Sequence, residues 1–149
     1  MSTPLEIRPL RSDDRAAWEP LWQGYLRFYR EELPAEVTDH AFARLSEQRD
    51  GMFGLVAVAD GGLVGFAHAI VHPSTWSRTS YTYLEDLFVD PAARGADAGR
   101  RLIEATAAAG RERGSDKLYW QTQQFNGRAR SLYDTVASLT SMVLYEKTL

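Results

Sequence analysis

The residues that could perform chemistry gather in one stretch of the chain, residues 83–105, with the sequence YLEDLFVDPAARGADAGRRLIEA. A strand expected over residues 81–89 ends at Asp90-Pro91, and a helix expected over residues 98–113 begins a few residues later. The first N–H groups of a helix have no partner within it and carry partial positive charge, so they attract phosphate. A glycine-rich loop before a solvated basic helix has the same composition and stays open as an alternative. The pattern favours a pyrophosphate site, in which small residues expose the backbone and arginines add charge, formed by Arg94, Gly95, Ala96, Ala98, Gly99, Arg100 and Arg101.

Two adjacent carboxylates, Glu85 and Asp86, precede this loop on the same expected strand. An alkylamine has a pKa of about 10.4 and is mostly charged at neutral pH, so it must lose a proton before it can act as a nucleophile. A nearby carboxylate can attract the ammonium group and accept that proton, directly or through water. In a regular strand neighbouring side chains point to opposite faces, so only one of the two can face a given cleft. An edge-strand carboxylate paired with an arginine is the alternative.

A second group of residues suits a cationic ligand, because aromatic faces and carboxylates both attract positive charge. The same aromatics occur at helical spacing and equally fit a core, and adjacent glutamates are typical of a solvated surface. His68 and Ile70 share a strand face, which His72 joins if the strand extends that far. A proton relay is one interpretation of these histidines, and an ordinary core or surface histidine is the favoured one. The candidate acceptor residues are Tyr25, Tyr29, Glu31, Glu32, Trp76, Glu85 and Asp86.

The hydrophobic pattern of the chain predicts the helices and strands that must position these residues. Spacing of three and four residues predicts helices over the segment that Pro34 ends and over residues 35–48, 98–113 and 128–137. β-branched and apolar runs predict strands over residues 6–10, 53–59, 63–71, 81–89, 118–123 and 142–146. The order β-α-α-β-β-β-α-β-α-β indicates an α/β or α+β sheet with helices on its faces. With no repeat or linker, residues 1–149 are expected to form a single domain.

Composition excludes several kinds of site. The chain has no cysteine, which rules out disulfides, thiolate catalysis and cysteine zinc sites, and its three histidines are too scattered for a metal site. The net charge is −3 with dispersed basic residues, so a nucleic-acid partner is not expected. No apolar run approaches the roughly 20 residues of a membrane helix. A cytoplasmic protein without a membrane partner is therefore expected.

The stretch that begins at Arg94 resembles the acyl-CoA-binding motif of the GNAT superfamily of N-acetyltransferases, Arg/Gln-x-x-Gly-x-Gly/Ala, in which Arg94 fills the first place and Gly99 the last. The resemblance covers residues 7–145. It implies a mixed, mostly antiparallel central sheet of six to seven strands with about four helices, acetyl-CoA as cosubstrate and, by analogy alone, a homodimer. The segments YLED (83–86) and HPSTW (72–76) are similar to the branch with polyamine and diamine acetyltransferases and the fungal histone and D-amino-acid acetyltransferases. Transfer of an acetyl group to a primary amine of a small molecule or peptide is thus implied.

The resemblance also implies roles for individual residues. Glu85 matches the catalytic base, and Tyr133 matches the acid that protonates the departing thiolate; a core aromatic is the alternative for Tyr133. Asn126 resembles the asparagine that binds the pantetheine arm, although a helix N-cap would also use it. An extended pantetheine can pair with the backbone as a peptide does at a sheet edge, and one of these amides could stabilise the tetrahedral oxyanion. That pairing is expected at Leu87, Phe88 and Val89, if the strand is splayed.

Asp97 departs from the motif, because it stands where the family has its middle glycine. Two like charges within about 4 Å repel by roughly 1 to 4 kcal/mol, which would weaken CoA binding about tenfold or more. The carboxylate could instead turn outward or cap the helix. A weakened GNAT-fold protein that binds acyl-CoA or another small ligand as a sensor is therefore the alternative function.

Overall fold

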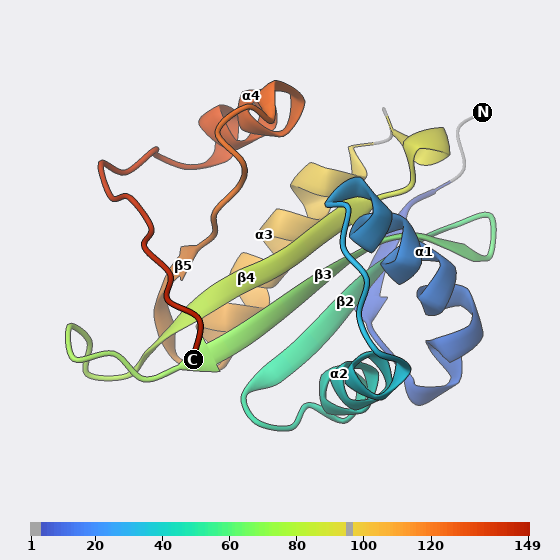
Figure 1. Ribbon diagram of the computed structural model, residues 1–149, viewed down its shortest axis with the longest axis horizontal. Helices are drawn as coiled ribbons and strands as arrows, with labels where there is room; N and C mark the ends of the chain where they lie inside the picture. Colours follow the sequence, from blue (N-terminus) through green and yellow to red (C-terminus); the bar gives the residue numbers. More distant parts are fainter. Residues whose placement is uncertain (1–3, 95–96) are drawn as a thin grey trace.

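A five-stranded sheet divides the helices into two layers in the computed structural model, which describes residues 4–94 and 97–149. The strands lie side by side in chain order, and β1 to β4 are antiparallel while β5 runs parallel to β4 (Figure 1). They are β1 (Glu6–Pro9), β2 (Met52–Ala59), β3 (Gly62–His72), β4 (Ser80–Val89) and β5 (Ser115–Tyr119). The helices are α1 (Arg15–Phe28), α2 (Ala35–Glu47), α3 (Ala98–Glu112) and α4 (Gly127–Val136), with 3-10 turns at Ser12–Asp14 and Pro91–Ala93.

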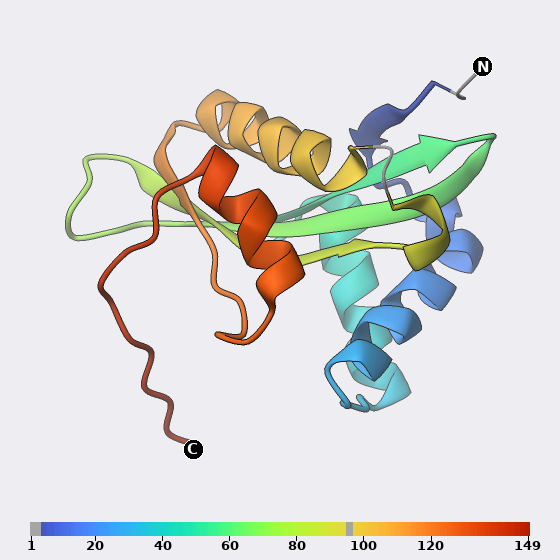
Figure 2. The ribbon, with the colours of Figure 1, turned by 90° about the horizontal axis from the view of Figure 1, so that it is seen from above.

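Each face of the sheet has its own apolar core, because alternate residues of a strand point to opposite sides. Figure 2 shows α3 along one face and α1 with α2 beneath the other. On the α1 and α2 side, Val56 and Phe66 pack against Trp18, Trp22 and neighbouring apolar residues of the two helices. On the α3 side, the intervening strand residues pack against α3, and Leu132, Tyr133 and Val136 of α4 join them. The helix that carries Tyr133 is therefore anchored on the same side of the sheet as the phosphate-binding candidate.

A β-bulge interrupts β4 at the two carboxylates. Ala69 pairs with Leu84 and His68 pairs with Asp86, so Glu85 is the extra residue. Leu84 and Leu87 consequently both pack on the α3 side, whereas Asp86 contacts His68 in the core of the opposite face. The expectation that Glu85 and Asp86 point to opposite faces is therefore wrong, because a bulge inserts one extra residue and so places two consecutive residues of a strand opposite one partner residue. Both carboxylates act on Tyr25 of α1, on one side of the sheet.

The pairing of β4 with β5 stops before β4 ends. The last pair is Tyr83 with Tyr119, while β4 continues to Val89. Beyond Tyr83, no strand formed by the described residues lies beside this edge of β4, and the chain after β5 turns away toward α4 (Figure 1). Backbone N–H and C=O groups at such an edge are free to pair with another extended chain.

The mixed, mostly antiparallel sheet and the four helices confirm the expected α/β (α+β) architecture, but the described residues form five strands rather than six to seven. The strand expected at 142–146 does not form, and β5 ends at Tyr119 instead of continuing to residue 123. A strand needs a neighbour that completes its hydrogen bonds, and residues 137–149 leave the body after α4 without pairing with β5 (Figure 2). In the described part of the chain, no helix combines the length and apolar character needed to cross a bilayer.

Candidate acyl-transfer site

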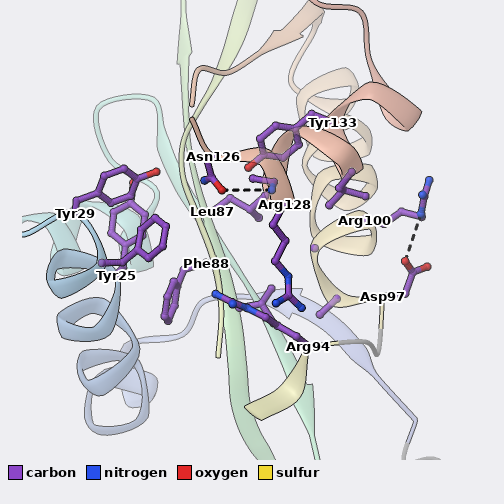
Figure 3. A pocket seen from close by; sticks show the side chains of 16 residues that line it. Tyr25, Tyr29, Leu87, Phe88, Arg94, Asp97, Arg100, Asn126, Arg128 and Tyr133 are labelled. Carbon is purple, nitrogen blue, oxygen red and sulfur yellow. Dashed lines mark hydrogen bonds and ion pairs between the residues drawn. The ribbon is translucent and has the colours of Figure 1, made fainter. Parts of the chain in front are cut away.

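A cavity of about 580 Å³ opens at the unpaired edge of β4, between α1, α4 and the first turn of α3 (Figure 3). This volume lies within the usual range of roughly 300 to 1,000 Å³ for small-molecule sites. The structure brings most of the predicted site residues to its wall. They are Tyr25, Tyr29, Leu87, Phe88, Val89, Arg94, Ala98, Gly99, Arg100, Asn126 and Tyr133, to which the cavity adds Phe28, Asp97, Arg128, Ala129 and Leu132. Gly95 and Ala96, also predicted here, lie outside the described residues.

The first turn of α3 forms the cationic end of the cavity. Arg94 reaches it from the loop after β4 and Arg128 from the first turn of α4, and Figure 3 shows their side chains close together in the cavity. The free N–H groups of the α3 N-terminus add partial positive charge at the same place. Sequence reasoning missed Arg128, although a basic residue just after the predicted ligand Asn126 was a usable signal. This end of the cavity can hold an anion such as a diphosphate.

Gly99 lets α4 approach α3 closely. A Cβ atom added at this position would lie 3.2 Å from Cδ2 of Leu132, a tighter contact than side chains normally make. A residue larger than glycine would therefore press on α4. The packing of Leu132 against Gly99 thus helps to place the neighbouring Tyr133 at the cavity wall.

Asp97 turns its carboxylate away from this end. It is the N-cap residue of α3 and adopts a left-handed backbone conformation with a φ of 65°, which suits glycine and which aspartate tolerates better than most residues. Its side chain makes no cap hydrogen bond; instead its Oδ1 atom lies 3.3 Å from Nε of Arg100. The Asp97–Arg100 pair lies on the opposite side of α3 from Arg94 and Arg128 (Figure 3). Arg100 also donates to Thr135, so its guanidinium is occupied outside the anion site.

Tyr133 and Asn126 face the edge of β4 from α4. Burial, with a smaller contribution from the Tyr29 phenol, raises the pKa of the Tyr133 phenol to about 12. Its ring also packs edge-on against Trp120, with ring centroids 5.5 Å apart. The side-chain oxygen of Asn126 accepts from the backbone N–H of Ala129, so Asn126 caps α4. The capping alternative is therefore observed, and the residue still lines the cavity.

The two carboxylates of the bulge do not themselves line the cavity. Asp86 lies behind the cavity wall, because it hydrogen-bonds the phenol of Tyr25, which lines the cavity. Burial raises the pKa of Tyr25, and the charge and hydrogen bonding of Asp86 raise it further. Glu85 is exposed in surface area, but the protein around it removes part of its hydration. This desolvation raises the pKa of Glu85, the charge of Asp86 adds to the effect, and the positive charge of Arg44 opposes it.

Three of the predicted acceptor residues are not part of the cavity wall. Trp76 lies in the connection between β3 and β4 with 84% of its surface exposed, so its assignment to this pocket is wrong. Glu31 and Glu32 are exposed after the end of α1 and are not part of the cavity wall. The sequence could not place these residues, because their position depends on how two long connections run over the surface.

The histidines have different surroundings. His68 is buried and bonds both Trp18 and Asp86. His72 is at the far end of β3, where its Nε2 atom is 2.7 Å from the Tyr119 hydroxyl. Within the part of the chain that the structure describes, no group of three or more histidine or carboxylate side chains is arranged to hold a metal ion.

Comparison with known proteins agrees with this geometry. The profile of the acetyltransferase (GNAT) family matches residues 18–136. The D-amino-acid N-acetyltransferase HPA3 of Saccharomyces cerevisiae is 34% identical over 143 residues, which cover 95% of this chain and 89% of that protein. The N-acetyltransferase YhfO of Bacillus subtilis is 33% identical over 130 residues, which cover 87% of each chain.

Solved structures share the fold at lower identity. The aminoglycoside N-acetyltransferase AAC(6')-Iy, solved in complex with CoA, superposes with a TM-score of 0.85 at 20% sequence identity over 99% of this chain and 97% of that one. The family match covers most of the chain, and two relatives exceed 30% identity over more than four fifths of their length. The chain belongs to the GNAT family of acetyltransferases and is an N-acetyltransferase enzyme.

Proposed function

We propose that this enzyme transfers an acetyl group from acetyl-CoA directly to the primary amine of a small molecule. The observation that carries this is the unpaired edge of β4, which faces Tyr133 across a cavity whose other end is the N-terminus of α3. An extended thioester-bearing arm can lie only where an extended strand edge is free. The anionic end of the same molecule then meets the cationic end of the cavity.

The residues present fit acetyl-CoA as cosubstrate. The N–H groups of Ala98 and Gly99, with the side chains of Arg94 and Arg128, would hold the diphosphate. The backbone from Leu87 to Val89 would pair with the pantetheine amides, and Asn126 would bind the same arm from the opposite side. The Phe88 amide or a neighbouring one would stabilise the oxyanion. When bound, the cosubstrate supplies the activated acetyl group, and AAC(6')-Iy of the same fold was solved with CoA.

The chemistry needs a proton acceptor and a proton donor. The amine nitrogen attacks the thioester carbonyl, a C–N bond forms and the C–S bond breaks, and the amine proton leaves toward a carboxylate of the bulge, with Glu85 as the base. Its raised pKa brings Glu85 closer to the pH at which it must accept a proton. Tyr133 protonates the departing sulfur, and its pKa of about 12 keeps the phenol protonated at neutral pH.

The acceptor amine would enter at the end of the cavity formed by α1. Tyr25 and Tyr29 present aromatic faces there, and Asp86 lies behind them with a negative charge. The aromatic faces and the negative charge both favour a cationic amine. HPA3 is named for D-amino acids and AAC(6')-Iy for aminoglycosides, so amines of small molecules are the first acceptors to test, followed by lysine peptides.

Calorimetric titration with acetyl-CoA, followed by thiol release over a panel of polyamines, D- and L-amino acids, aminoglycosides and lysine peptides, tests the function. Binding together with thiol release for at least one amine is expected. The alternative is a weakened member of the family that senses acyl-CoA. The Asp97–Arg100 ion pair favours this alternative, because Asp97 engages an arginine that would otherwise be available to bind phosphate. Heat of binding without thiol release would support that alternative. Folded protein that neither binds nor releases thiol would refute both.

The single domain of residues 1–149 is proposed to work as a homodimer in the cytoplasm. Its support is the segment after α4, where Leu139, Met142, Val143, Leu144 and Tyr145 are each more than two thirds exposed. β5 is an edge strand with a free side, and the corresponding segment of a second copy could pair with it. A monomeric mass by light scattering at micromolar concentration would contradict the dimer. A dimer that Leu144→Asp dissociates would support it.

A further inference from the structure

A buried chain of hydrogen bonds runs from Trp18 of α1 across β3 and β4, on the α1 side of the sheet, and returns to α1 at the wall of the cavity. The indole Nε1 of Trp18 donates to Nε2 of His68 over 3.1 Å, and Nδ1 of His68 is 2.9 Å from Oδ2 of Asp86. Trp18 is fully buried, His68 is 3% exposed and the Asp86 side chain is 15% exposed. Asp86 in turn bonds the phenol of Tyr25, which lines the cavity.

The chemistry of the indole assigns the hydrogens of this chain. An indole N–H can only donate, so Nε2 of His68 must be the acceptor. The imidazole hydrogen therefore resides on Nδ1 and is donated to Asp86. A histidine held in this way cannot pass a proton onward through Nε2, because that nitrogen is already occupied. It can fix the direction of the Asp86 carboxylate.

Packing leaves the imidazole little freedom. Phe66 stacks on it with ring centroids 4.3 Å apart and planes 9° from parallel, and Trp22 lies at 5.5 Å. The bulge at Glu85 is what turns Asp86 toward this ring instead of toward α3. A carboxylate with a fixed hydrogen-bond donor on its inner side presents its remaining lone pairs in one direction.

We propose that Trp18 and His68 are positioning residues, which hold the Asp86 carboxylate behind Tyr25 at the acceptor end of the cavity, where its negative charge attracts the cationic group of the amine. This role rests on the proposed function. It assigns Asp86 to acceptor binding and leaves Glu85 as the base. It also assigns a role to His68, which does not line the cosubstrate cavity.

A matched pair of variants tests the role. Asparagine and leucine have nearly the same size, but only asparagine carries an N–H donor near the place of Nδ1. His68→Leu should raise the KM for the amine about tenfold to a hundredfold, which is the loss expected for one hydrogen bond to a charged group. His68→Asn should recover most of that loss. The KM for acetyl-CoA should change by less than about twofold in both.

Two further measurements separate positioning from structural support. In the Asp86→Asn background, His68→Leu should no longer alter the amine KM, because the two effects act through one carboxylate. The ¹⁵N chemical shifts of His68 in the wild-type enzyme should report hydrogen on Nδ1. Equal losses in the leucine and asparagine variants, or hydrogen on Nε2 in the wild type, would overturn the role. If the wild type releases no thiol with any amine, the proposed function fails, whereas the NMR result still decides the hydrogen-bond chain.

Discussion

Replacing Asp97 by glycine tests how the one departure from the phosphate-binding motif affects the cosubstrate. The carboxylate points away from Arg94 and Arg128 and pairs with Arg100 at 3.3 Å, with side-chain exposures of 62% and 34%. An outward carboxylate about 8 Å from a diphosphate charge, at an effective dielectric of about 40, repels it by about 1 kcal/mol. Release of Arg100 from an exposed pair would add at most about 1 kcal/mol. Asp97→Gly should therefore lower the Kd for CoA by about fivefold to thirtyfold.

The effect on stability should be small, because two contributions oppose each other. Removing a left-handed non-glycine residue relieves about 1 kcal/mol of strain, whereas glycine gains about 0.5 to 1 kcal/mol of conformational entropy in the unfolded chain. The melting temperature should therefore shift by only a few degrees. A large fall in Tm would indicate that Asp97 has a structural role that its exposed position does not suggest.

Asp97→Asn is the matched control for charge. Asparagine also tolerates the left-handed conformation but carries no charge, so it should give most of the gain of glycine. Calorimetric titration with CoA measures all three proteins, and the difference between wild type and Asp97→Asn should shrink as salt rises from about 0.05 to 0.5 M. If neither variant binds CoA more tightly, the charge argument is refuted. A gain with glycine alone would show that shape, and not charge, limits the site.

The remaining predictions concern the acid, the base and the second arginine. Tyr133→Phe should lower kcat by about 10² to 10³ and leave the KM for acetyl-CoA nearly unchanged, because only the proton on the leaving sulfur is lost; an unchanged kcat would exclude Tyr133 as the acid. Desolvation raises the pKa of Glu85, and a base works only when deprotonated, so activity should fall as the pH drops below this raised pKa. Glu85→Gln should abolish this fall in activity at low pH, and a fall that persists in the variant would belong to another group. Arg128→Gln should weaken CoA binding about tenfold and reduce its salt dependence, whereas Arg111→Gln, at the exposed far end of α3, should leave both unchanged. Equal effects of the two substitutions would show that Arg128 does not bind the diphosphate.

Features that depend on neighbours along the chain could be predicted from the sequence. The helix at 98–112 follows from its apolar period and its small, basic first turn, and both Arg94 and Gly99 were found by their spacing to that helix. The strands of the antiparallel half follow from β-branched runs separated by turn residues. Such signals act over a few residues, where hydrogen bonds and backbone preferences are local.

Other features were decided by the tertiary structure. The bulge at Glu85 follows from the register of β3 against β4, and it reverses which face Asp86 occupies. The splay of β4 from β5 depends on where the chain after Tyr119 turns, and Arg128 reaches the anion site only because α4 packs on α3 at Gly99. Trp76 does not line the cavity, because it lies in the exposed connection between β3 and β4.

The sequence by itself therefore determined the family, the helices, most of the strands and the loop proposed to bind phosphate. The cavity, the place of Tyr133 on its wall and the partners of the bulge carboxylates required the fold, because Tyr25, Asp86 and Tyr133 come from three separate elements. Their mutual positions depend on strand register and helix packing, which are settled by burying two apolar faces at once. No short stretch of sequence contains that information.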